Sequence, residues 1–150
     1  ISVAGLHAGK QALAIDYRQG TPEALAKGDA RFDIVLALEI VEHVADVDLF
    51  LKSCGGLVKP GGLLFLSTLN RTAKAWALAI AGAEYVLRWL PRGTHDYAKF
   101  IQPAELARMT REAGLDTQEL IGMTYNPLTQ IYALGPDTDV NYIVHAIRPE

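Results

Sequence analysis

The feature that most constrains this chain is a pair of short apolar runs separated by a helical stretch. The runs are Phe32–Leu38 and Leu63–Ser67, and both are rich in residues that favour strands. Between them, the apolar residues of Glu39–Val58 recur at roughly helical spacing before the turn 59–62. A strand, a crossover helix and a second strand predict a βαβ unit with a parallel strand pair.

Other segments extend this unit into a layered sheet. Leu13–Arg18 is predicted to be an additional strand, and Pro103–Ala113 a helix with Pro in its first turn. Leu115–Tyr125 and Asn141–Ile147 are predicted to be closing strands. We therefore expect one α/β domain over 1–150 with a doubly wound, Rossmann-like sheet.

Composition narrows the classes of partner. A formal net charge of -3 and a pI of about 5.8 supply no positive field for phosphates, so nucleic acid is not an expected partner. Cys54 is the single cysteine, which excludes an intrachain disulfide and indicates a reducing compartment. No targeting peptide is visible at Ile1, and we predict a cytoplasmic location.

A helical insertion is predicted at about 71–100, where a short loop would normally suffice. At about 100° per residue, Lys74, Glu84 and Arg88 share one arc of the helix. The opposite face would be broad and apolar, formed by Trp76, Ile80, Ala83, Leu87 and Leu90. The apolar run stops at Glu84, so it is too short for a membrane span of about 20 residues.

The sharpest candidate site is the cluster Glu39, Glu42 and His43, directly after a predicted strand. If Glu39 opens the next helix, the three side chains share one face. Two carboxylates and an imidazole suit Mg²⁺, Mn²⁺, Fe²⁺ or Zn²⁺, with oxygen ligands favouring the harder ions. Acidic groups that merely favour a helix start explain the same spacing, so both interpretations stay open.

Two weaker candidates lie elsewhere. Gly20 and Thr21 follow the first predicted strand and could line an adenine or phosphate site, although a turn and a helix cap explain them equally well. His95 and Asp96 could form an acid/base pair carried by the insertion, or simply belong to a polar loop.

Together, several motifs resemble those of known methyltransferases. Phe32-Asp33-Ile34-Val35 running into Leu38-Glu39, then Leu57–Gly62 leading into Phe65, resembles strands four and five of class I S-adenosylmethionine methyltransferases. The more specific segments are Glu39–Val44, Phe65–Arg71, Gly82–Tyr85, Pro91–Asp96, Tyr125–Pro127 and Asp139–Tyr142. From about Ile15 onward, these resemble the O-methyltransferase family of ubiquinone biosynthesis.

The resemblance implies methylation of a catechol-type hydroxyl on a polyprenylated ring, with S-adenosylmethionine as the methyl donor. Glu39, Glu42 and His43 match metal ligands of that family. His43 and Glu42 would then act through Mg²⁺ or a similar cation, which lowers the pKa of the phenol and holds the nucleophile near the methyl. His95 remains a weaker catalytic candidate.

The resemblance also assigns cofactor and membrane contacts. Gly20 and Thr21 match the adenine-side loop, and Ala37 with Leu38 match the strand end that passes the cofactor. The insertion over 73–90 would act as a lid or as a peripheral contact at the inner face of the membrane. Other proteins of ubiquinone biosynthesis are further expected partners.

One departure from the family pattern concerns the cofactor loop. The family orders its strands 3-2-1-4-5-7-6, and the first strand with its Gly-rich loop and the acidic end of the second strand do not occur in this sequence. Without them the sheet would lack its centre. Unless residues before Ile1 supply these strands, we expect poor folding and weak cofactor binding.

Three alternatives remain open. One is another small-molecule methyltransferase that needs no metal. A second is a nicotinamide-dependent oxidoreductase or a non-catalytic nucleotide-binding domain, although the sequence contains no G-x-G-x-x-G turn. A third is a membrane-surface adaptor that docks through the insertion.

Overall fold

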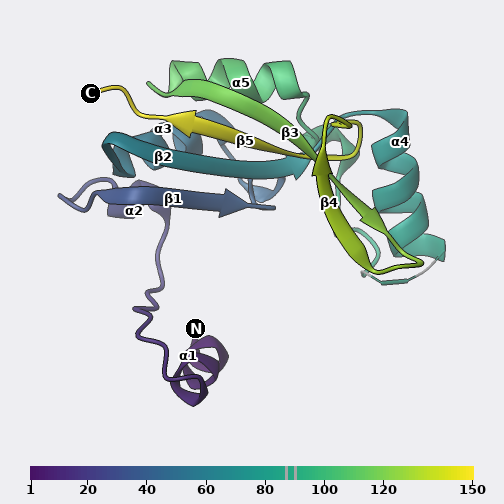
Figure 1. Ribbon diagram of the computed structural model, residues 1–150, viewed down its shortest axis with the longest axis horizontal. Coiled ribbons are helices and arrows are strands. Elements are labelled where there is room, and N and C mark those ends of the chain that lie inside the picture. Colours follow the sequence, from purple (N-terminus) through teal and green to yellow (C-terminus); the bar gives the residue numbers. More distant parts are fainter. Residues whose placement is uncertain (87, 90) are drawn as a thin grey trace.

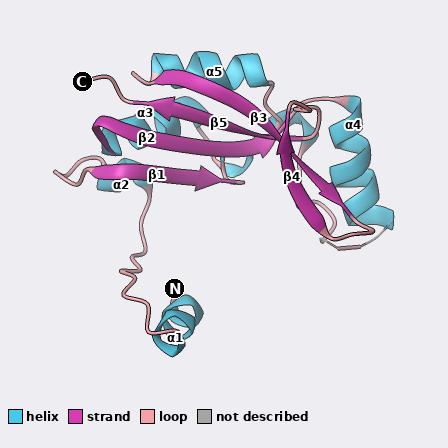
Figure 2. Cartoon of the chain, in the orientation of Figure 1, coloured by secondary structure: helices cyan, strands magenta, loops and turns pink. Residues whose placement is uncertain are grey.

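The computed structural model describes residues 1–86, 88, 89 and 91–150, and within them a five-stranded sheet forms the centre (Figure 1). The strand order is β1-β2-β5-β3-β4. The strands are β1 (Phe32–Leu38), β2 (Val58–Leu69), β3 (Asp116–Asn126), β4 (Ile131–Gly135) and β5 (Asn141–Ile147). Helices line this sheet and extend from one end of it (Figure 2).

The helices are short. They are α1 (Ser2–Lys10), α2 (Pro22–Leu25), α3 (Val47–Leu57), α4 (Ala73–Ala75), α5 (Pro103–Glu112), the 3₁₀ turns η1 (Val41–His43) and η3 (Tyr97–Lys99), and the π-helix η2 (Trp76–Val86). Helix α3 contacts both α2 and α5. Helix α1 lies apart from the sheet, at the end of an extended stretch of chain (Figure 1).

The pairing pattern confirms the predicted βαβ unit. β1 and β2 are parallel, with Leu38 beside Ser67, and α3 connects them. β5 lies antiparallel between β2 and β3, and β4 adds a hairpin to β3. The register places Leu69 of β2 beside Asn141 of β5, so β5 begins where β1 and β2 end. This is the α/β architecture expected from the sequence.

The core lies between the sheet and helices α3 and α5. Leu64 and Leu66 of β2 and Val144 of β5 are fully buried in it, packed with Phe50 and Leu51 of α3. Arg148 caps the C-terminal end of α3. Its guanidinium donates to the carbonyl groups of Gly55, Gly56 and Val58, the last of which lies just beyond the helix.

The opposite face of β1 is open. Ile34 and Leu36 are 53% and 63% exposed, while Ala37, which points to α3, is buried. A parallel strand covered on both faces would be apolar and buried throughout, and β1 alternates instead. Helices of the described chain therefore bury one face of this strand only.

Two sequence predictions on local structure are wrong, and one strand was missed. Leu13–Arg18 is not a strand, because none of the described strands lies beside it to pair with its backbone, and Leu13, Ile15 and Tyr17 are exposed. The helix predicted from Glu39 begins only at Val47, where Asp46 caps it by accepting from the Leu49 N–H at 2.9 Å. Strand β4 was not predicted.

The insertion also differs from its prediction. After the three residues of α4 the chain continues as a π-helix, so a period of 100° per residue does not apply. Glu84, predicted to share a polar arc with Lys74 and Arg88, is 1% exposed, whereas Trp76 of the predicted apolar face is 48% exposed. Leu87 and Leu90 lie outside the described residues.

The β3–β4 hairpin provides a stability test through two paired glycines. A Cβ at Gly122 would overlap the Asp137 carbonyl group, whereas one at Gly135, its cross-strand partner, would meet nothing within 4 Å. We expect Gly122→Ala to lower the free energy of unfolding by about 1–3 kcal/mol. Gly135→Ala should stay within about 0.5 kcal/mol of the wild type in urea unfolding. Equal losses would contradict this packing.

Candidate functional site

The candidate site forms where β1 and β2 end, around Glu39. The Glu39 backbone N–H donates to the Ser67 carbonyl oxygen at 3.1 Å and to Ser67 Oγ at 2.9 Å. Its Oε1 accepts from Ser67 Oγ at 2.6 Å and from Asn141 Nδ2 at 2.9 Å. Glu39 has a φ of 53°, a left-handed conformation that costs a non-glycine residue free energy and is often found at functional sites.

A second carboxylate lies beside the first. Glu42 is 3% exposed, and its Oε2 accepts from Thr68 Oγ1 at 2.7 Å. Its Oε1 is buried, and no donor in the described chain reaches it. Because a buried carboxylate oxygen without a donor is costly, this atom is a candidate for contact with a bound group.

The predicted metal site is not formed as predicted. The helix that was to align the three side chains from Glu39 begins only at Val47, eight residues later. Glu39 and Glu42 instead bind hydroxyl groups of β2, and His43 is exposed. No group of three His, Cys, Asp or Glu side chains in the described ranges could hold a metal ion. The donor set therefore does not fit the predicted Mg²⁺ site.

A cavity of about 570 Å³ lies on one side of the β1 end. The predicted cofactor residues Gly20, Thr21 and Ala37 line it together with apolar side chains of β1 and α3, whereas Leu38 does not. Thr21 also caps α2, accepting from the Ala24 N–H at 3.2 Å, so both interpretations of this residue apply. Burial raises the pKa of the Cys54 thiol in this wall to about 12, so it adds no charge.

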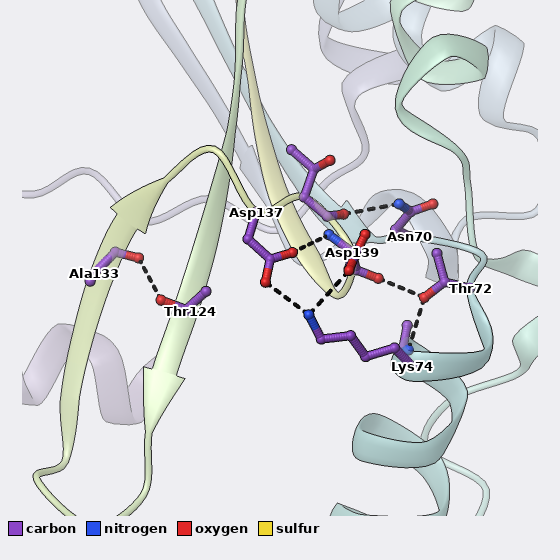
Figure 3. Close-up of polar contacts among 9 residues, drawn as sticks. Asn70, Thr72, Lys74, Thr124, Ala133, Asp137 and Asp139 are labelled. Carbon is purple, nitrogen blue, oxygen red and sulfur yellow. Dashed lines mark hydrogen bonds and ion pairs between the residues drawn. The ribbon is translucent and has the colours of Figure 1, made fainter.

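A second cavity of about 560 Å³ lies between η2 and the β3–β4 hairpin. Its polar rim ties the insertion to the loop before β5, as Figure 3 shows: Lys74 Nζ binds Asp137 at 2.8 Å and Asp139 at 3.1 Å. Thr72 Oγ1 donates to the Asp139 carbonyl at 2.6 Å, and Asn70 Nδ2 to that of Thr138 at 2.9 Å. The two carboxylates raise the pKa of Lys74, so it stays charged.

His95 belongs to a different pair from the one predicted. Its Nδ1 lies 2.9 Å from Oε1 of the buried Glu84, while Asp96 caps η3. Glu84 also accepts the backbone N–H groups of Gly93 at 2.7 Å and His95 at 2.8 Å. The His95 and His43 rings are 6.1 Å apart, so the insertion brings an imidazole held by a carboxylate close to His43.

Sequence reasoning missed the partners of the acidic cluster. Ser67, Thr68 and Asn141 lay in quoted motifs, but no role was assigned to them. The signal available was the polar run that follows the apolar part of β2, at the strand end where such sheets bind ligands. Glu84 was assigned to solvent.

Comparison with known proteins shows the family of this chain. The model of a methyltransferase domain matches residues 5–120. The chain belongs to the methyltransferase domain family. The ubiquinone biosynthesis O-methyltransferase of Brucella anthropi is 56% identical over 149 residues, which are 99% of this chain and 60% of that protein. This confirms the resemblance predicted from the motifs, and the chain spans about 60% of the length of this relative.

Solved structures agree on the fold. An S-adenosylmethionine-dependent methyltransferase from Clostridium acetobutylicum covers 99% of this chain with 71% of its own, with a TM-score of 0.67 and 9% identity. A [4+2]-cyclase gives the same TM-score at 14% identity, covering 99% of this chain with 62% of its own. Because the same fold hosts a cyclase, the fold alone does not specify methyl transfer.

The Glu84 contact predicts a pH dependence. Burial alone favours the neutral acid, but the bonds from His95 and Gly93 outweigh it and hold the pKa of Glu84 below its ordinary value. A depressed pKa stabilises the fold above the unfolded-state pKa of about 4.3, and this stability is lost as pH falls through the folded value. The unfolding free-energy gap between the wild type and Glu84→Gln should therefore be largest near neutral pH and shrink below about pH 4.

Urea unfolding from pH 3 to 8 measures this gap. Glu112→Gln, which alters an exposed pair with Arg108, is the matched control and should show a much smaller gap. A Glu84→Gln gap that does not change with pH would contradict the assignment.

Proposed function

We propose that this protein methylates a phenolic hydroxyl of a polyprenylated catechol in ubiquinone biosynthesis, with S-adenosylmethionine as the donor. The observation that carries the proposal is the end of β1, which lines the first cavity and is joined by one hydrogen bond to the wall of the second. Ala37 and Ile40 line the first cavity, and Glu39 between them binds Asn141, which lines the second. A donor and an acceptor on either side of this strand end would meet at Glu39.

The first cavity fits the donor. Its walls are mostly apolar, and its volume lies within the range of roughly 300–1,000 Å³ usual for small-molecule sites. The loop 18–22 and the face of β1 with Ala37 would hold the adenosine part. When bound, S-adenosylmethionine supplies an electrophilic methyl group on a sulfonium.

The acidic cluster would act on the acceptor. Both bonds to the Glu39 side chain reach Oε1, so Oε2 can accept a phenolic hydrogen. Ser67 and Asn141 fix the carboxylate, which orients the hydroxyl and raises the nucleophilicity of its oxygen as the proton shifts toward Oε2. His43 and the His95 ring near it stay candidates for passing that proton to solvent. No role here requires the divalent cation, which remains a prediction from the resemblance.

Methyl transfer tests the proposal directly. The intact protein is incubated with labelled S-adenosylmethionine and a short-tailed demethylubiquinol, in Mg²⁺ and in EDTA. Glu39→Gln should lower kcat by about 100-fold or more, because a general base contributes about that much. Glu119→Gln, an exposed carboxylate on β3, should leave kcat unchanged.

Each arm answers a separate question. No transfer by the wild type contradicts the proposed function, and an unaffected Glu39→Gln contradicts the role of Glu39. Loss of transfer in EDTA would support the predicted cation, and equal transfer in both buffers would support a metal-free methyltransferase.

Peripheral membrane contact through 73–90 is a second part of the proposal. No helix in the described part of the chain is long and apolar enough to cross a membrane. Trp76, Leu78, Tyr85 and Trp89 are nevertheless exposed on this segment, as expected of a surface that rests on lipid. Such contact would bring the site to a substrate dissolved in the bilayer and to other enzymes that act on it.

Vesicle co-sedimentation checks this contact. Trp76→Glu with Tyr85→Glu should reduce the bound fraction several-fold, because each charge opposes burial in the interface and neither residue lines the second cavity. Val3→Glu on α1 is an exposed control that should bind as the wild type does. Equal binding by all variants would remove the membrane from the proposal.

A further inference from the structure

The second cavity has an aromatic wall. Trp89 and Tyr125 make an edge contact with ring centroids 6.4 Å apart, and Tyr125 and Tyr132 lie 4.6 Å apart. All three rings line the cavity and are 40% to 66% exposed. Such a row of exposed rings offers apolar area that a ligand can bury.

The rest of the lining favours a neutral ligand. Leu78, Met123 and Val140 continue the apolar surface. Lys74 and Asp137 are the charged residues among the lining groups that the structure describes, and they pair with each other at 2.8 Å. Because Lys74 also binds Asp139 at 3.1 Å, two carboxylates already pair with this ammonium, and the cavity suits an uncharged, elongated molecule better than a phosphate or a carboxylate.

One end of the cavity is polar because of Asn141. Its Nδ2 donates to Glu39 Oε1 at 2.9 Å, which fixes the orientation of the amide, since the carboxylate needs a donor there. Its Oδ1 is buried, and no donor in the described chain reaches it. A ligand hydroxyl placed at Oδ1 would satisfy that atom and lie next to Glu39.

We propose that this cavity binds the substrate along its length, with the isoprenoid chain against Trp89, Tyr125 and Tyr132 and a ring hydroxyl donating to Asn141 Oδ1. This assignment rests on the proposed function for the identity of the ring, and extends it by naming the groups that bind the chain. Asn141 acts as a positioning residue, and Tyr132 contributes to affinity for the chain.

Calorimetry on the intact protein tests the site without turnover, with S-adenosylhomocysteine present. The ligands are 4-methylcatechol and a catechol that carries a geranyl chain at the same ring position. Each methylene that becomes buried adds about fourfold in affinity, so the geranyl compound should bind at least about tenfold more tightly. Its binding should also show the more negative heat-capacity change that marks apolar burial.

Two neighbouring residues of β4 give matched variants. Tyr132 and Ile131 are 66% and 60% exposed and point to opposite faces of the strand, and only Tyr132 lines the cavity. Tyr132→Ala should weaken the geranyl ligand about tenfold and leave 4-methylcatechol unchanged. Ile131→Ala should change neither. Asn141→Leu should weaken both ligands by a similar factor.

Several results would overturn the site. They are equal affinity for the two catechols, equal effects of Tyr132→Ala and Ile131→Ala, and binding of geraniol as tight as that of the geranyl catechol. The last would show a general lipid-chain slot in which Asn141 has no part.

The two proposals fail separately. If the geranyl chain of the ligand increases affinity but no methyl transfer occurs, the binding site is supported and the proposed function is rejected. Methyl transfer with the same KM for both catechols would keep the function and reject the site.

Discussion

The Glu39 carboxylate links three neighbouring strands at one end of the sheet. It follows β1, it accepts from Ser67 of β2, and it accepts from Asn141 at the start of β5. Hydrogen bonds to a charged group are worth about 1.5–3 kcal/mol each, which offsets the roughly 1–3 kcal/mol cost of a left-handed non-glycine residue. The bonds to its side chain, together with the two that its backbone N–H donates to Ser67, therefore stabilise the φ of 53° at Glu39.

That interaction also explains why the sequence predicted the residues of the site but not its geometry. The apolar periods of β1, β2, α5 and β5 specify elements that the sheet then pairs, and these predictions are confirmed. Helix propensity placed Glu39 at a helix start, but its partners lie 28 and 102 residues away. Local pattern holds no information on such contacts, so the carboxylates were found and their alignment was not.

The same limit applies to the two strand errors. An apolar alternation such as Leu13–Arg18 is a strand only where another strand offers hydrogen bonds, and in the described chain it meets none. Strand β4 is the opposite case. Its own sequence did not predict a strand, but it forms one because its backbone hydrogen-bonds with β3. Whether a segment forms a strand therefore depends on the neighbouring strand as well as on its own residues.

The insertion shows how a segment without a core of its own is fixed in place. At one end the Lys74 ammonium lies between two carboxylates of the loop before β5, and at the other the buried Glu84 carboxylate takes three donors from 93–95. A π-helix between these anchors cannot follow the period of an α-helix, which is why the predicted apolar face failed. The anchors hold η2 opposite the hairpin, and the cavity between them follows from that placement.

The two cavities both have mostly apolar walls, so the chemistry of their linings does not tell them apart. One hydrogen bond links them, because Ala37 and Ile40 line the first cavity and Glu39 between them binds Asn141, which lines the second. The fold alone does not decide the chemistry, since a cyclase has it too. The bonds from Ser67 through Glu39 to Asn141 fix a carboxylate at the end of β1. Under the proposed function, the Oε2 of that carboxylate would orient the phenolic hydroxyl that is methylated.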